Sequence, residues 1–137
     1  MDSVAIMKYF EDEGIEISGL KKEEGILVSE LYYELSDDVI EAAKSYANDS
    51  CEEEAESEKW FSEFYEPYLQ DFAVDDFGAL IEDIMEKCEV SAQYVSLGLG
   101  ENCDGCLFGV VIYEKGKEVD INKELDELEK QDRKSVV

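Results

Sequence analysis

Four cysteines are the residues of this sequence best suited to bind a metal or to react, because the chain contains no histidine. Cys103 and Cys106 have the C-x-x-C spacing of zinc and redox motifs, whereas Cys51 and Cys88 stand alone. Both single cysteines fall on apolar positions of expected helices, where a buried free thiol is the more common role. We therefore expect no metal and no cofactor, and we keep a zinc site formed by all four cysteines as an alternative.

The absence of histidine also removes most catalytic arrangements. Ser–His and Cys–His nucleophile pairs are excluded, and so are histidine general bases. The acidic pairs Asp75–Asp76 and Glu101–Asp104 are too sparse for a calcium loop or a two-metal nuclease site. The sequence thus predicts a protein that is not an enzyme.

The dominant feature of the composition is negative charge. The chain has 37 acidic and 12 basic residues among 137, a net charge of −25, and its isoelectric point is near 4.1. Residues 30–90 hold 20 acidic and 3 basic residues, a net charge of −17. Such a surface repels nucleic acid and anionic lipid, so direct binding to either is not expected. It attracts basic macromolecules over long distances.

The elements that must position these carboxylates follow from apolar periodicity. The first part of the chain predicts a helix over 4–13, a strand over 15–20, a strand over 26–35 and a helix over 37–48. Ser3 is the expected N-cap of the first helix, with Val4, Met7 and Phe10 facing inward. Ser36 is the expected N-cap of the helix over 37–48.

The middle of the chain predicts two strongly acidic helices. Ser50 and Glu53 form a capping box that would open a helix over 51–66. Pro67 predicts a kink or a restart, after which helical spacing continues through 68–72. The clearest helix covers 75–89. Its apolar stripe consists of Phe77, Leu80, Ile81, Ile84, Met85 and Cys88.

A C-terminal β-hairpin over about 92–113 follows. A two-residue turn at Asp104–Gly105 would place Cys103 opposite Cys106. In that register six large apolar residues share one face: Val95, Leu97, Leu99, Phe108, Val110 and Ile112. A last helix over 121–132 would direct Ile121, Leu125 and Leu128 inward, and a frayed tail is expected over 133–137.

These elements predict one α+β domain covering residues 1–137. An antiparallel sheet of about four strands, including the hairpin, would be packed by about five to six helices, with the acidic helices in the middle of the chain. No signal peptide and no apolar run long enough to span a membrane is present in the sequence. We therefore expect a cytoplasmic protein. The oligomeric state is not indicated.

Carboxylates line one side of each expected acidic helix. The spacing amounts to about one charge per 3.5 Å along 75–89 and about one per 3.4 Å along 51–66. One strand of duplex DNA carries about one phosphate per 3.4 Å. Like charges four residues apart, such as Glu82 and Glu86, each cost a few tenths of a kcal/mol, which is a penalty typical of functional residues.

Aromatic residues are interleaved with these acids. Exposed Trp60, Tyr65 or Tyr68 beside carboxylates would suit the arginines and lysines of a partner through cation–π contacts. The expected partner-binding residues are Glu52, Glu53, Glu54, Glu56, Glu58, Trp60, Glu63, Tyr65, Glu66, Asp75, Asp76, Glu82, Asp83, Glu86 and Glu89.

In size, charge density and small α+β make-up the chain resembles the acidic nucleic-acid mimics that phages and mobile elements use against restriction or CRISPR nucleases. The resemblance implies a non-catalytic inhibitor of a basic nucleic-acid-binding protein or nuclease complex. It would act in the cytoplasm of the host cell if a phage encodes it.

Other interpretations remain open. An immunity protein or antitoxin that neutralises one basic nuclease toxin would have similar charge. A zinc-bearing or scaffold interaction domain would use the charge only for solubility. The acidic residues could also form a solvated surface or an adaptation to high salt.

Overall fold

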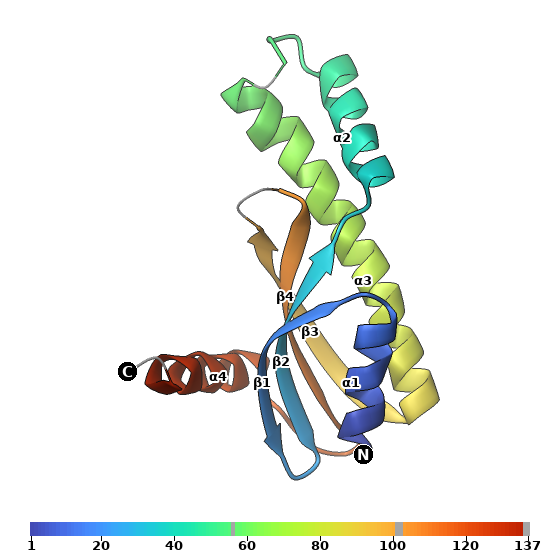
Figure 1. Cartoon of the computed structure of the whole chain (residues 1–137), viewed down its shortest axis with the longest axis vertical. Coiled ribbons are helices and arrows are strands. Elements are labelled where there is room, and N and C mark those ends of the chain that lie inside the picture. Colours follow the sequence, from blue (N-terminus) through green and yellow to red (C-terminus); the bar gives the residue numbers. More distant parts are fainter. Residues whose placement is uncertain (56, 101–102, 136–137) are drawn as a thin grey trace.

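A four-stranded antiparallel sheet forms the centre of the molecule (Figure 1). The computed structural model describes all residues except 56, 101–102 and 136–137, and it does not describe the side chains of 131–135. The strands lie in the order β1-β2-β4-β3. The elements are α1 (Ser3–Asp12), β1 (Glu16–Glu23), β2 (Ile26–Glu34), α2 (Asp37–Ser50), the π-helical segment η1 (Trp60–Tyr65), α3 (Glu66–Cys88), β3 (Val90–Leu99), β4 (Gly105–Glu114) and α4 (Ile121–Ser135).

The α+β class and the four-stranded antiparallel sheet are found, but the expected number of helices is wrong. The described residues form four α-helices and not five to six. Ser50 ends α2 and does not open a new helix, and residues 51–55 and Ser57 are irregular. The pieces expected over 68–72 and 75–89 belong to the single helix α3. Pro67 is the second residue of α3 and directly follows the π-helical η1, so the helical path continues across it while the winding changes from π to α.

Of the two helix N-caps predicted for the N-terminal half, one is found and one is wrong. Ser36 caps α2 as predicted, with its Oγ accepting from the Val39 N–H at 3.4 Å. α1 is capped by Asp2 and not by Ser3. Phe10 is buried and Met7 is partly buried against the same cluster, as predicted, and Ile6 is also buried; Val4 is 72% exposed and not inward.

The hairpin forms, but its predicted register is wrong. Leu99 pairs with Cys106, so the connection is longer than two residues and Cys103 does not pair with Cys106. Val95 pairs with Gly109 and faces away from the side of Phe108, while Tyr94 pairs with Val110 and contacts Phe108. A bulge between Ser96 and Gly98 shifts the alternation. The register is set by packing against α3, which an alternating pattern alone does not determine.

The two faces of the sheet carry separate apolar clusters. α1 and α3 cover one face, where the rings of Phe77 and Phe108 stack at 4.1 Å. α4 covers part of the other face, where Leu125 and Leu128 pack on Val28 and Val111. The inward positions predicted for α4 are confirmed. The frayed tail expected over 133–137 falls partly outside the described residues and stays a prediction.

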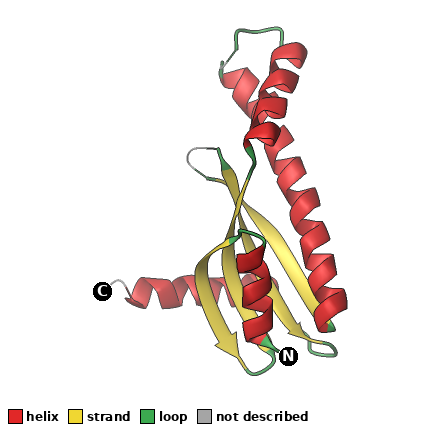
Figure 2. Ribbon diagram, turned by 45° about the vertical axis from the view of Figure 1, so that its right-hand side comes forward, coloured by secondary structure: helices red, strands yellow, loops and turns green. Residues whose placement is uncertain are grey.

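A two-helix arm, defined here as residues 36–70, extends beyond the sheet (Figure 2). It consists of α2, the irregular connection, η1 and the first turn of α3. Its interior is formed by small and aromatic side chains. The buried residues are Ala43, Ala47, Cys51, Trp60, Tyr65 and Leu69. None of the described helices is apolar over a length sufficient to cross a membrane.

Candidate partner-binding surface on the arm and α3

The arm owes its shape to the packing of Trp60. Its indole Nε1 donates to Asn48 Oδ1 on α2 at 3.0 Å, and its ring stacks on Tyr65 at 4.8 Å. Residues five apart lie about 140° apart around an α-helix, so Trp60 and Tyr65 could not stack there. The π-helical winding of η1, with hydrogen bonds between residues five apart, brings them to one side. The stack fixes the Trp60 ring within η1, and the Trp60 hydrogen bond to Asn48 ties η1 to α2.

With its interior built this way, the arm presents its carboxylates outward. Glu52, Glu53 and Glu54 are exposed on the irregular connection at the tip, and Glu58 and Glu63 are exposed on the helix that follows. Glu66 is half-buried, and Glu56 lies outside the described residues. Four further exposed acids on α2 add to the charge of the arm and were missed by the sequence analysis. They are Asp37, Asp38, Glu41 and Asp49.

The acidic arc expected over 75–89 is divided by the structure into two groups. Asp76 accepts a hydrogen bond from the Tyr33 hydroxyl of β2. Asp83 accepts one from the Tyr9 hydroxyl of α1 at 2.7 Å and forms an ion pair with Lys87 at 2.9 Å. These two carboxylates fasten α3 to its neighbours. The exposed residues left in the arc are Asp75, Glu82, Glu86 and Glu89.

The titration of these groups reflects the pairing. Burial, followed by the hydrogen bond and the charge of Asp83, raises the pKa of Tyr9 to about 12. Burial and the bond to Asp76 raise the pKa of Tyr33 above its usual value. The hydrogen bonds from Tyr9 and Lys87 lower the pKa of Asp83. Both tyrosines therefore remain protonated donors at neutral pH.

The predicted match between the carboxylate spacing of the acidic helices and the phosphate spacing of DNA is wrong. Residues 51–55 and Ser57 are not helical, so the regular rise assumed for a helix over 51–66 does not apply. On α3 the exposed carboxylates other than Asp76 are Asp71, Asp75, Glu82 and Glu86, which cover about 22 Å with gaps of four, seven and four residues. The surface has the total charge of a nucleic-acid segment without its regular axial repeat.

The aromatic residues are distributed differently from the prediction. Trp60 and Tyr65 are only 2% and 5% exposed, so neither reaches a partner in this fold. The exposed aromatics of this region are Tyr46, at 45%, and Phe72, at 39%. Half-buried Tyr68 contacts Tyr46, with ring centroids 5.3 Å apart. The sequence does place Tyr46 close to acidic residues of α2, which was a signal for a partner-binding aromatic. Whether the Tyr46 side chain is exposed depends on how α2 packs against α3.

The four cysteines are free and are not brought together. Cys51 is buried in the arm, whereas Cys88 is the last residue of α3, at the end of that helix opposite to the arm. Burial raises the pKa of both Cys103 and Cys106, which favours the neutral thiol over the thiolate that metals and redox partners require. Among the described residues the cysteines form no group with metal-binding geometry.

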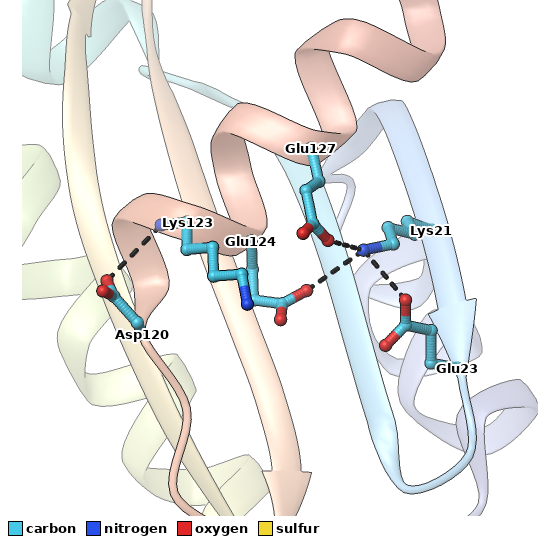
Figure 3. Close-up of polar contacts among 6 residues, drawn as sticks. All are labelled: Lys21, Glu23, Asp120, Lys123, Glu124 and Glu127. Atoms are coloured by element: carbon cyan, nitrogen blue, oxygen red, sulfur yellow. Dashed lines mark hydrogen bonds and ion pairs between the residues drawn. The ribbon is translucent and has the colours of Figure 1, made fainter.

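One carboxylate cluster in the described part of the chain has geometry compatible with a cation. Oxygens of Glu23, Glu124 and Glu127 lie within 4.8 Å of one another. Figure 3 shows that the Lys21 ammonium lies among them, at 3.0, 3.2 and 2.5 Å respectively. The lysine supplies the positive charge, so the cluster joins β1 to α4 and is a structural feature.

Comparison with protein-family models, with curated proteins and with solved structures finds no match.

Proposed function

We propose that this chain is a non-catalytic inhibitor that binds a basic nucleic-acid-binding protein, such as a nuclease or a nuclease complex, and occupies its nucleic-acid groove. The observation that carries the proposal is the projecting arm, which holds 11 acidic and 2 basic residues in 35 positions. The carboxylates of the arm take the place of phosphates because they are negatively charged and project from the sheet. They do not reproduce the regular spacing of phosphates along DNA.

Three properties support this function. The arm is narrow, so it can enter a groove that admits a nucleic-acid strand (Figures 1 and 2). Its tip carries the exposed carboxylates Glu52, Glu53 and Glu54, while its buried aromatics keep the two helices together. The net charge of −25 accelerates encounter with a basic surface.

The test neutralises the tip. In a variant with Glu52→Gln, Glu53→Gln, Glu54→Gln and Glu58→Gln, binding to purified basic nucleases and DNA-binding proteins is measured by calorimetry at several salt concentrations. The unmodified chain should compete with duplex DNA for its target, and its affinity should fall steeply with salt. The variant should bind at least tenfold more weakly.

A matched control changes the same charge elsewhere. Glu11→Gln, Asp12→Asn, Glu16→Gln and Glu24→Gln together alter four exposed residues of α1, β1 and the following turn. Equal weakening in both variants would mean that only total charge matters. Unchanged binding in the tip variant, or binding that DNA does not displace, would overturn the proposal.

A second candidate function is favoured by the exposed Tyr46 and Phe72. Aromatic side chains beside carboxylates are typical hot spots of a tight, single-partner interface, as in an immunity protein that neutralises one basic nuclease toxin. That function predicts affinity that persists at high salt and is lost in Tyr46→Ala. A mimic should tolerate this substitution.

A further inference from the structure

The two edge strands of the sheet differ sharply in composition. β1, at one edge, contains four charged residues in eight: Glu16, Lys21, Lys22 and Glu23. β3, at the other edge, has ten residues and no charged one, in a chain that is 36% charged. Proteins normally protect an edge strand with charges or proline, because its unpaired N–H and C=O groups can pair with another strand. β3 has neither.

β3 is also unusually exposed. Of the seven exposed large apolar side chains in the described residues, three lie on this strand: Tyr94 at 36%, Val95 at 37% and Leu97 at 43%. α4 packs mainly on β1, β2 and β4; on the Val95 side of β3, Gln93 donates to the Val119 carbonyl, whereas Val95 itself stays exposed. The bulge between Ser96 and Gly98 interrupts the strand near one end only, and the pairing from Val90 to Ser96 is regular.

Carboxylates of α3 lie beside the same strand. The Tyr94 hydroxyl reaches Gly78 of α3 so closely that a Cβ there would lie 2.5 Å from it. Asp75 and Glu82 precede and follow Gly78 by three and four residues, so they lie on its face one turn away in each direction. Both are exposed. The α3 side of the β3 edge is therefore acidic, and the opposite side is apolar at Val95.

We propose that β3 accepts an extended, basic segment of the partner as a fifth strand of the sheet. Main-chain hydrogen bonds to β3 would provide affinity, and alternate side chains would provide specificity. Lysine or arginine on one side of the segment meets Asp75 and Glu82, and apolar residues on the other side cover Val95. This inference rests on the proposed function, because it takes the partner to be basic.

Charge argues against a second copy of this chain as the occupant. Each copy carries −25, and pairing β3 with β3 would bring the Asp75 and Glu82 carboxylates of both copies toward one another. A basic strand removes that repulsion and neutralises the same groups.

The experiment uses the full-length chain and a ten-residue probe peptide that alternates lysine and valine. Binding is measured by fluorescence anisotropy, and the site is located by amide hydrogen exchange of the labelled protein in NMR spectra. We expect alternate β3 amides to become at least tenfold more protected. A peptide with five lysines followed by five valines has the same charge without the alternation, and should give no such protection.

Two pairs of variants locate the contact. Val95→Lys should weaken binding of the alternating peptide at least tenfold, whereas Val4→Lys, the same change at an exposed site on α1, should not. Asp75→Asn with Glu82→Gln should weaken it similarly, whereas Glu11→Gln with Asp12→Asn should not.

Other outcomes would overturn the proposal. If amide protection were confined to β1 or to the arm, the peptide would bind by charge attraction without adding a strand. The same would follow if the control peptide of five lysines and five valines protected the β3 amides equally. A dimer in sedimentation that Val95→Lys dissociates would assign β3 to a second copy. If the tip variant lost the basic protein partner while Val95→Lys kept it and β3 remained unprotected, the strand proposal would fail and the proposed function would stand.

Discussion

The two faces of the sheet are held by different forces. On the α3 face, the Phe77–Phe108 stack belongs to a continuous apolar cluster that reaches from α1 to the arm. On the α4 face, the buried part of the cluster contains four residues, and Lys21 is ion-paired to Glu124 of α4. Gly109 allows α4 to approach closely, because a Cβ there would lie 2.6 Å from a Leu125 methyl.

This contrast indicates how a chain with so much negative charge folds. The α3 face buries large side chains, and the Asp76 and Asp83 carboxylates that would otherwise repel are hydrogen-bonded to tyrosines. The α4 face has less apolar surface and depends on a lysine to hold three carboxylates together. The first face should therefore dominate stability, and the second should respond to pH.

The largest effect is expected from Phe108→Ala. Phe108 is fully buried between Phe77 and β-sheet neighbours, and removing it should lower the free energy of unfolding by about 3–5 kcal/mol. Urea denaturation followed by circular dichroism measures this. Phe72→Ala, at a 39% exposed ring, is the control and should cost much less. Equal losses would mean that the α3 face is not the main source of stability.

Leu128→Ala should have the next largest effect, a loss of about 2–5 kcal/mol, with the lower end expected because the α4 cluster is small. Hydrogen exchange should show α4 opening while α3 stays protected. If α3 and α4 lost protection together, the two faces would form one cooperative unit and the contrast would be wrong.

Lys21→Met should cost about 1–3 kcal/mol at neutral pH, because it leaves Glu124, only 13% exposed, without its cation. Methionine retains most of the length and the unbranched shape of the side chain, so the loss would mainly report charge and not packing. The control Lys22→Met removes an exposed lysine on the same strand and should be near neutral. Thermal denaturation of both variants would detect the difference. Equal stability of the two would rule out the cluster as a tether.

The smallest expected effect is the pH dependence of that difference. The hydrogen bond from Lys21 lowers the pKa of Glu127 below its ordinary 4.5, so this contribution is present above pH 4.5 and is lost as pH falls through the lowered value. Burial opposes the charge of Lys21, but its carboxylate partners raise its pKa above 10.5, so its contribution is complete below pH 10.5 and is lost at higher pH.

The stability difference between the unmodified chain and Lys21→Met should therefore be constant from about pH 6 to 9 and shrink at acidic pH. Comparing variants removes the general relief of repulsion that acid brings to a chain of this charge. A difference that did not change below pH 4 would contradict the assignment of Glu127.

Much of the architecture could be predicted from local signals. β1, β2, α2 and α4 were expected within a few residues, because alternation, the Ser36 cap and the Leu125–Leu128 spacing act over short distances. The start of the helix expected over 51–66 was wrong, since helical structure begins only at Glu58, because a run of glutamates beside a capping signal favours helix locally. The stacking of Trp60 on Tyr65 and the end of α2 decide otherwise.

The candidate surface likewise has some features that the sequence predicts and others that depend on tertiary contacts. Charge is a property of composition, so the sequence by itself determined that the chain is acidic, that histidine chemistry is absent and that the middle carries most of the charge. Tertiary structure alone decided that Asp76 and Asp83 bind tyrosines, that Trp60 and Tyr65 are buried, and that β3 lies at an unprotected edge. These depend on contacts between residues far apart in the chain, which local periodicity does not encode.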